Sequence, residues 1–240
     1  MVRLDQALVE RGFCQSREKA KRAIMAGQVR INDHPGRKAS DSVQSADKLI
    51  LLAPEKFVSR GGFKLEHALN YFQLDVSGKV AVDLGASTGG FTDCLLQRGA
   101  ARVYAVDVGQ GQIAWKLRHD PRVVLMERTN ARDLTPPKFP PPFERAHLVA
   151  IDCSFISLRK VLPAAATLLA SGGQIVALIK PQFEAGKAEA DRGAGVIRDS
   201  AIHERILREL QEFVAARGGL RWHGVTESPI VGPAGNKEFL

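Results

Sequence analysis

Short apolar segments alternate with helical patterns from residue 79 onward, and this alternation constrains the fold of the 240-residue chain more than any other feature. It is typical of an α/β fold, in which helices cover both faces of a mostly parallel, Rossmann-like sheet. A further strand is expected near the end of the chain, over 220–227. The segments predicted to form the main strands are 80–84, 102–106, 123–126, 147–151 and 174–179.

Ionisable residues lie at the carboxyl ends of four of these strands. In open parallel sheets, ligands bind beyond the carboxyl ends of the strands. A single strand-end carboxylate usually caps a helix or lies in a loop. Several ionisable groups at one rim are different, because each costs free energy unless it is paired or hydrated. The sequence therefore predicts a ligand site at the rim that carries Asp83, Asp107, Asp152 and Lys180.

The turn after the first strand reads Gly-Ala-Ser-Thr-Gly-Gly at 85–90. Its glycine spacing departs from the Gly-x-Gly-x-x-Gly fingerprint of dinucleotide sites, and it lacks the Gly-Lys-Ser/Thr of a phosphate-binding loop. Asp83 would repel a pyrophosphate and suit a cation. Asp107 follows at close to the roughly 20-residue distance expected of a carboxylate that binds a ribose diol. A cationic ligand with a ribose and no phosphate indicates S-adenosylmethionine.

Different residues are expected to bind different parts of the cofactor. Asp83 would face the ammonium end of the ligand, and Asp107 would accept hydrogen bonds from the ribose hydroxyls. Backbone N–H groups at a helix N-terminus bind anions well. The methionine carboxylate is therefore expected at the turn residues Gly85, Ser87, Thr88 and Gly89.

The N-terminal segment is disproportionately basic. Residues 1–59 hold 11 Lys and Arg against 7 Asp and Glu, whereas residues 60–240 hold 23 against 19. The same excess of positive charge thus falls on a third of the length, which favours a polyanionic partner. Helical patterns are expected around Leu4–Leu8 and over 17–26, with Ser16 as N-cap, followed by strands over 28–32 and 47–52.

This order of helix, helix and hairpin resembles the S4 RNA-binding domain, on the residues of 3–5, 16–20 and 27–32. The resemblance implies a small α+β domain whose second helix and following loop lie on RNA. An ordinary solvated helix face is the alternative. The segment has few aromatic residues, so phosphate and shape recognition are favoured over base stacking. The expected RNA contacts are Arg3, Arg17, Lys19, Lys21, Arg22, Arg30 and Arg60.

Motifs along the whole chain resemble the TlyA family, whose catalytic domain is related to the FtsJ 2′-O-methyltransferases. They lie at 59–65, 83–93, 151–158, 179–184 and 235–240. The resemblance implies a seven-stranded class I methyltransferase sheet and methylation of the ribose 2′-hydroxyl of cytidines in ribosomal RNA. It also implies that Asp133 lies near the adenine of the cofactor. Some members of the family are labelled haemolysins.

The resemblance further implies a catalytic tetrad of Lys64, Asp152, Lys180 and Glu238. A ribose hydroxyl must lose its proton as it attacks the methyl group, and a base works best when its pKa lies near the working pH. Burial and a second cation lower the pKa of a lysine. We therefore expect Lys180 to be the general base, with Lys64 assisting. Asp152 would orient Lys180 and the hydroxyl, and Glu238 would hold Lys64.

The predicted division is an S4-like domain over 1–58 and a methyltransferase domain over 59–240. The linker is expected where 53–56 breaks the strand pattern. Residues 184–198 are expected to form a mobile loop over the substrate side or plain surface. The sequence stops two residues after Glu238, where the family's last strand runs on, so either the chain has been cut or that strand is short.

Composition excludes several classes of protein. No apolar run approaches the ~18 residues of a membrane span, and the N-terminus does not read as a signal peptide. The three cysteines, Cys14, Cys94 and Cys153, are too few and too scattered for a disulfide framework or a zinc site. We therefore expect no metal, and we expect the protein to be cytoplasmic.

Two alternatives stay open beside an RNA methyltransferase: a non-catalytic RNA-binding or ribosome-assembly factor with a relic cofactor pocket, and a pore-forming haemolysin. An intact tetrad counts against the first, and the lack of a membrane-length apolar segment counts against the second. The sequence alone identifies neither the target nucleotide and subunit nor the oligomeric state.

Overall fold

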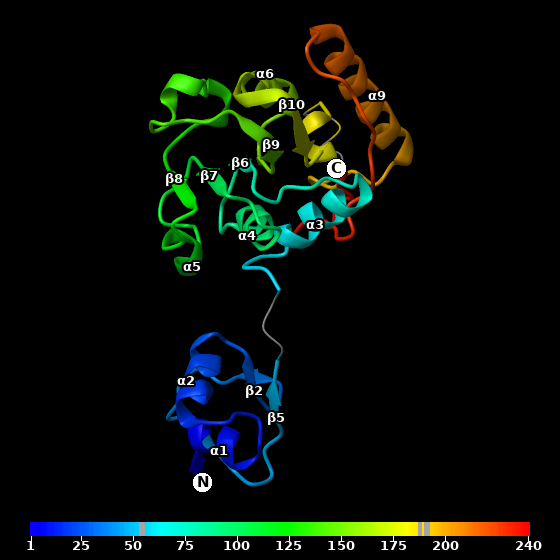
Figure 1. Cartoon of the computed structure of the whole chain (residues 1–240). Coiled ribbons are helices and arrows are strands. Elements are labelled where there is room, and N and C mark those ends of the chain that lie inside the picture. The colour runs from blue at the N-terminus through cyan, green and yellow to red at the C-terminus, as the bar shows by residue number, and fades with distance from the viewer. Residues whose placement is uncertain (53–55, 187–188, 190–192) are drawn as a thin grey trace. The chain divides into compact units, whose positions relative to one another are not determined.

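The protein is described here by a computed structural model covering residues 1–52, 56–186, 189 and 193–240. It divides into two compact units, Met1–Lys56 and Phe57–Leu240 (Figure 1). Phe57 belongs to the second unit because it is buried against Gly62 and packs edge-on to Phe63 at 5.1 Å. The expected linker break at 53–55 and the centre of the expected loop, 187–188 and 190–192, lie outside the described residues.

The N-terminal unit packs two helices against short strands, as the sequence predicts. Ser16 caps the second helix by accepting a hydrogen bond from the backbone of Lys19. Its core consists of Leu4, Leu8, Ala20, Ile24 and Val29 with their neighbours. Strand β2 pairs antiparallel with β3 and β5, and β1 pairs with β4. The elements are β1 (Val2–Arg3), α1 (Leu4–Glu10), α2 (Arg17–Met25), β2 (Val29–Ile31), β3 (His34–Pro35), β4 (Ser42–Val43) and β5 (Leu49–Leu51).

The C-terminal unit contains a five-stranded parallel sheet in the order β10-β9-β6-β7-β8. The strand order reverses between β6 and β9, and the rim at such a reversal is where α/β sheets bind ligands. The elements are α3 (Gly61–Tyr71), β6 (Val80–Leu84), α4 (Gly90–Gln97), β7 (Arg102–Val106), α5 (Trp115–Arg118), β8 (Val123–Met126), η1 (Ala131–Asp133), η2 (Pro136–Lys138), β9 (Ala146–Ile151), α6 (Leu158–Leu168), β10 (Leu169–Ala177), α7 (Pro181–Glu184) and α9 (Ser200–Arg217).

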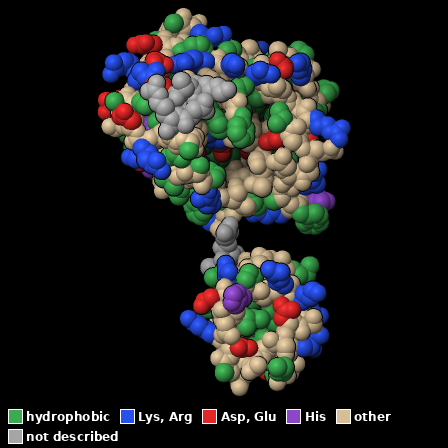
Figure 2. Space-filling view, turned by 180° about the vertical axis from the view of Figure 1, so that it is seen from behind, with side chains coloured by type: hydrophobic (Ala, Val, Ile, Leu, Met, Phe, Trp, Pro, Cys, Tyr) green, Lys and Arg blue, Asp and Glu red, His purple; other side chains and the backbone are tan. Residues whose placement is uncertain are grey.

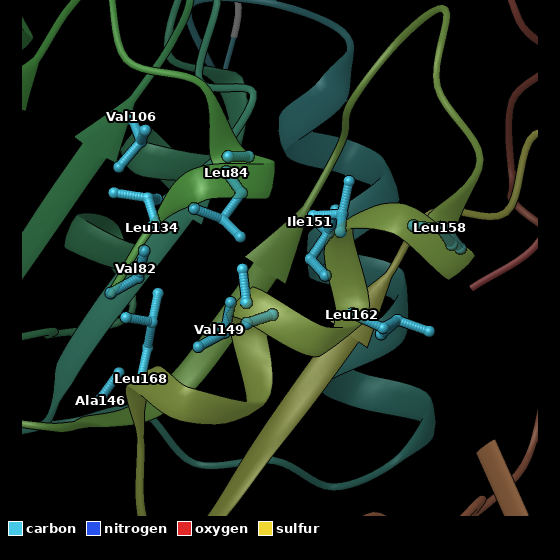
Figure 3. Close-up of a cluster of buried hydrophobic side chains, with 14 of the residues drawn as sticks. Val82, Leu84, Val106, Leu134, Ala146, Val149, Ile151, Leu158, Leu162 and Leu168 are labelled. Carbon is cyan, nitrogen blue, oxygen red and sulfur yellow. The ribbon is translucent and has the colours of Figure 1, made fainter. Parts of the chain in front are cut away.

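Two hydrophobic clusters cover the two faces of this sheet. On one face, Val82, Val149 and Ile151 meet apolar side chains of α6, including Leu162 and Leu168 (Figure 3). On the other face, alternate strand residues meet α3 and α4. Because both faces are covered, the strands read as continuous apolar runs rather than as alternating ones.

The predicted α/β sheet is confirmed, but in the described residues of the C-terminal unit it has five strands and not seven. The expected strand over 220–227 is wrong for most of its length, because only its end pairs. Glu227 forms an antiparallel bridge with Phe239, and Phe239 forms another with Ile179. Glycines at 218 and 219 with positive φ, and a further glycine at 224, reduce the strand propensity of this segment.

Candidate active site

The rim between β6 and β9 is built by close backbone contacts. Asp152, directly after β9, donates its backbone N–H to the carbonyl of Leu84 at 2.9 Å. Gly85 has a φ of 89°, and a Cβ atom there would lie 2.5 Å from the carbonyl oxygen of Asp152. Only glycine fits this approach, so the turn after β6 and the residue after β9 are locked together. The C-terminal unit is also hollowed on one face, where acidic side chains gather (Figure 2).

Lys180 and Asp152 form an ion pair at this rim. Lys180 Nζ lies 2.6 Å from Asp152 Oδ1 and donates a hydrogen bond to Ser154 Oγ at 2.9 Å. The side chains are 10% and 23% exposed, so the pair is largely shielded but reachable from solvent. The ammonium also lies 5.9 Å from the ring centroid of Phe183.

Lys64 and Glu238 form a second ion pair that is more deeply buried. Lys64 lies on the first turns of α3, and its ammonium donates a short hydrogen bond to Glu238 Oε2. Only 9% of the Lys64 side chain and 1% of the Glu238 side chain are exposed. A buried charge pair of this kind ties α3 to the terminal segment of the chain.

Backbone pairing brings the two ion pairs to the same place. Ile179 and Phe239 exchange both hydrogen bonds of an antiparallel bridge, at 2.7 and 3.0 Å. Lys180 and Glu238 therefore occupy the next opposed positions, where side chains are neighbours. A Cβ atom added to Gly61 would lie 3.8 Å from Asp152 Oδ2. Lys64 follows Gly61 by one turn of α3. The four residues of the expected tetrad thus converge on one rim.

An exposed aromatic side chain stands beside the Lys180–Asp152 pair. Phe155 is 90% exposed and has a φ of 61°, a left-handed conformation that is rare for a bulky residue. Its ring lies 5.1 Å from that of Phe183. Strain of this kind clusters at ligand sites. Sequence reasoning did not single out Phe155, although it lies within the motif that contains Asp152.

Asp83 is completely buried under the glycine turn. Thr92 of α4 donates to its Oδ2 at 2.6 Å, whereas Oδ1 has no hydrogen-bond partner among the described residues. Burial raises the pKa of Asp83 to about 7, and the charges of Asp152 and Asp107 add to this effect against the hydrogen bonds from Thr92. A cationic group that reached Oδ1 would satisfy both the free lone pairs and the charge.

Asp107 organises the turn on the other side of β6. Its Oδ2 accepts from the backbone N–H of Ser87, and its Oδ1 from that of Gly109, both at 2.7 Å. Each carboxylate oxygen retains a second acceptor site for a ligand hydroxyl. A hollow beside it is lined by Ala86, Ser87, Ala105, Asp107, Gly109, Gln112, Ile113, Leu125 and Glu127. Ile113 and Leu125 offer it apolar walls, although as it stands the hollow has room for only about one water molecule.

The described turn uses most of its backbone donors internally. The N–H of Gly85 donates to the carbonyl of Val106, that of Ser87 to Asp107 and that of Gly89 to the carbonyl of Ala86. Gly89, with a φ of 96°, is the N-cap of α4, and a Cβ there would lie 2.3 Å from Leu117 Cδ1. The first N–H groups of a helix have no partner within it and face whatever lies before it. Ser87 and Thr88 are exposed at this turn. Of the four turn residues expected to meet the carboxylate, Thr88 alone has a backbone N–H with no recorded partner among the described residues, and it lies just before the N-terminus of α4.

The residue expected near the adenine, Asp133, lies outside the hollow beside Asp107. It is exposed on η1, where its carbonyl accepts from Lys138 Nζ at 2.6 Å. Glu127 lines the hollow instead and accepts from the backbone of Gly111 and from Arg118. Glu127 comes directly after β8, so its strand-end position was the signal that could have identified it.

The cations expected to contact RNA have different surroundings. Arg3 and Arg17 both hydrogen-bond to the buried carboxylate of Asp5. Exposed Arg22 pairs with Glu18 on the same helix. Lys19 donates a hydrogen bond to Gln15, and Arg30 donates one to the carbonyl of Asp33. Lys21 is exposed, as is Arg60 at the N-cap of α3.

The segment expected to be a loop or plain surface over 184–198 is partly buried where it is described. Glu184 accepts hydrogen bonds from the backbone of Leu158 and the hydroxyl of Ser157, and so caps α6. Ile197 is buried, and its N–H donates to the side chain of buried Asn236 at 2.9 Å. Both ends of this segment are therefore anchored to the unit.

Comparison with known proteins agrees with this arrangement. Residues 57–240 match the family model described as FtsJ-like methyltransferase, and residues 2–49 match the S4 domain. The 16S/23S rRNA (cytidine-2'-O)-methyltransferase TlyA of Mycobacterium tuberculosis is 46% identical over 100% of this chain and 88% of its own length. Hemolysin A of Brachyspira hyodysenteriae is 40% identical over 100% of this chain and 98% of its own length.

A solved structure of a hemolysin-named protein from Streptococcus thermophilus is also similar. It is 45% identical, with a TM-score of 0.74 over 99% of this chain and 86% of that chain. Among the described helices, none combines the length and apolar character needed to cross a membrane. Two family models, one for each unit, and relatives that are similar along the whole chain lead to one assignment. The chain belongs to the TlyA family, in which an S4 domain precedes an FtsJ-like methyltransferase domain.

Proposed function

We propose that this protein transfers a methyl group from S-adenosylmethionine to the 2′-hydroxyl of a cytidine in ribosomal RNA. The observation that carries the proposal is the convergence of two Lys–carboxylate pairs beside the turn after β6. The family supports the type of reaction. The name of the M. tuberculosis relative supports the ribose hydroxyl of cytidine as the acceptor.

The residues of the turn would hold the cofactor. Thr88 would offer its backbone N–H to the carboxylate at the N-terminus of α4, and Gly85, Ser87 and Gly89 would shape the turn around it. Asp83 Oδ1, which has no partner among the described residues, suits the ammonium group. Asp107 has the acceptor sites for the ribose diol. When bound, S-adenosylmethionine supplies an electrophilic methyl group on sulfur.

Lys180 would serve as the general base. Its neutral amine would accept the proton of the 2′-hydroxyl as the oxygen bonds to the methyl carbon and the bond from that carbon to sulfur breaks, with the neutral thioether as the leaving group. Asp152, 2.6 Å away, would then stabilise the ammonium that results. Proton transfer to a positioned base and alignment of the attacking oxygen each lower the barrier by several kcal/mol, on the order of 10²- to 10⁴-fold for the base alone.

Lys64 and Glu238 would complete the tetrad. Their pair is neutral overall and deeply buried, so it supports the wall on which Lys180 and Asp152 lie. Asp133, exposed on η1, remains a more distant candidate for the adenine end of the cofactor.

RNA would be captured by both units. The cations of residues 1–56 and Arg60 would neutralise phosphates. The exposed ring of Phe155 offers a face on which a base released from its stack could lie. Because the Lys180–Asp152 pair is recessed, the ribose of a target nucleotide can reach Lys180 only if that nucleotide is held out of the base stack.

The test uses labelled S-adenosylmethionine with separated ribosomal subunits, followed by mapping of the modified nucleotide. We expect label on one or a few cytidine riboses. A model RNA that carries 2′-deoxycytidine at the mapped position should accept none. Label on a base, or equal label on the deoxy substrate, would contradict the proposal.

A further inference from the structure

A buried carboxylate contacts two of the arginines that are predicted to bind RNA. Asp5, in the first turn of α1, has no exposed surface. Its Oδ1 accepts from Arg3 Nε and from the backbone of Gln6, both at 3.1 Å. Its Oδ2 accepts from Arg17 at 2.9 and 3.3 Å and from Arg3 at 3.4 Å. One acidic side chain therefore joins two arginines that belong to different elements, β1 and α2.

Both arginines keep part of their guanidinium groups in solvent. Their side chains are 49% and 54% exposed. Each guanidinium carries five N–H donors, and each uses Nε and one terminal nitrogen on Asp5. Within the described residues, the other terminal nitrogen of neither Arg3 nor Arg17 has a recorded partner. The two free edges can thus bind an oxyanion without releasing the carboxylate.

We propose that Asp5 is a positioning residue of the RNA interface, which holds Arg3 and Arg17 as a preorganised pair for the phosphate backbone. The inference rests on the proposed function, since it assumes that residues 1–56 bind RNA. A free arginine loses rotamer entropy when it binds a phosphate, and a side chain that is already fixed loses less. Asp5 therefore strengthens RNA binding although it carries the same sign of charge as RNA.

The neighbouring ion pair on α2 is exposed and serves as a comparison for the buried contacts of Asp5. Arg22 and Glu18 lie four residues apart and are 75% and 76% exposed. Exposed pairs of this kind hold their partners only weakly. Burial of Asp5 disfavours its charged form, but the hydrogen bonds and charges of Arg3 and Arg17 outweigh this and lower its pKa to about 2. Asp5 is therefore charged at any pH at which the protein works.

The experiment compares full-length Asp5→Asn with Glu18→Gln. Each variant removes one negative charge from the same unit, so simple electrostatics predicts tighter RNA binding for both. We expect Glu18→Gln to bind a ribosomal RNA fragment as tightly as the parent or more tightly. Asp5→Asn should bind about tenfold more weakly, with a raised KM for RNA and an unchanged kcat at saturation. Equal or tighter binding by Asp5→Asn would overturn the proposal.

Two further variants separate positioning from folding. Ala20→Gly weakens the buried side of α2 without touching Asp5. If it lowers the melting temperature of the unit as much as Asp5→Asn does and weakens RNA binding equally, the role of Asp5 is only structural and the proposal fails. Arg17→Lys keeps the charge but lacks the fork that serves carboxylate and phosphate together. It should bind several-fold more weakly, and unchanged binding would also count against the proposal.

Failure of the proposed function gives a different pattern. If neither the parent nor the Arg3→Ala, Arg17→Ala double variant responds to RNA, residues 1–56 do not bind RNA and both ideas fall. If the double variant loses affinity and Asp5→Asn does not, RNA binding stands and only the positioning role of Asp5 is lost.

Discussion

The two ion pairs of the candidate site differ in burial and in what surrounds them. Lys64–Glu238 is closed off, and a Cβ at Gly232 would lie 2.6 Å from Glu238 Oε1, so protein atoms pack directly against it. Lys180–Asp152 retains access to solvent and has a hydroxyl and two aromatic rings beside it. Under the proposed function, we therefore assign the inner pair to the support of the rim and the outer pair to the chemistry.

Under the proposed function, this difference in burial would allow one rim to be both rigid and reactive. A buried pair loses its solvation on folding and is stable only while both partners are present. A partly exposed pair can exchange protons with a substrate and with water. Substitutions in the outer pair should therefore affect turnover with little loss of stability, whereas substitutions in the inner pair should affect both.

The largest effect is expected for Asp152→Asn. Without the carboxylate, the ammonium that forms on Lys180 loses its stabilising partner, so methyl transfer should fall by about 1,000-fold. The free energy of unfolding should change by only about 1 kcal/mol, because the side chain is partly exposed. Single-turnover transfer and urea denaturation measure the two effects. A large loss of stability with normal turnover would reverse the assignment of the pairs.

Glu238→Gln should show the opposite balance. It leaves the Lys64 ammonium buried without a counter-charge, which costs about 3 kcal/mol of stability, measured by urea denaturation. Replacing both partners by Lys64→Met and Glu238→Leu should recover most of that stability, since no charge remains buried. If the single variant is as stable as the parent, the inner pair does not support the rim.

A smaller effect is expected from Asp83→Asn, and it depends on pH. The folded-state pKa of about 7 is above the ordinary value of 3.8, so the folded protein binds the proton more tightly than the unfolded chain. Stability from this group is present below pH 4 and is lost as the pH rises toward 7.

The asparagine variant of Asp83 removes that loss. Without cofactor, it should be more stable than the parent at pH 8 by on the order of 2 kcal/mol, with no gain near pH 4. Thermal melts at the two pH values measure this. A stabilisation that is the same at both would show that Asp83 is not held in its uncharged form by burial.

The smallest effect is expected from Ser154→Ala. It removes one hydrogen bond from Lys180 Nζ and leaves the ion pair to Asp152 in place. A loss of about 1 kcal/mol, or roughly fivefold in transfer rate, is the size expected of one such bond. Ser45→Ala, at an exposed position in the other unit, is the matched control. A loss of transfer rate as large as that of Asp152→Asn would indicate that the hydroxyl of Ser154 takes part in the reaction itself.

The sequence predicted the rim well because parallel strands end together. Asp83, Asp107, Asp152 and Lys180 are all placed by that single rule. The approach of Lys64 to Glu238 could not be derived in this way, since it depends on a bridge between Ile179 and Phe239 that no local pattern encodes. Only the family resemblance suggested it.

Other features depended on packing that a pattern does not reveal. Nothing in the alternation of residues distinguishes Asp5, which is buried beneath two arginines, from an ordinary helix N-terminal acid. The expected strand over 220–227 has apolar residues in suitable positions, but among the described residues only its last two, Thr226 and Glu227, pair with the end of the chain. Long-range contacts decide such cases, and local propensity does not.

The most direct test of the account is single-turnover methyl transfer by Lys180→Met, started from enzyme already saturated with S-adenosylmethionine and with RNA. Binding of both should remain close to that of the parent, because the turn after β6 and residues 1–56 are untouched. The account predicts that the rate of transfer falls by at least about 1,000-fold. A rate within about tenfold of the parent, with both ligands bound, would contradict the role of Lys180 as the base.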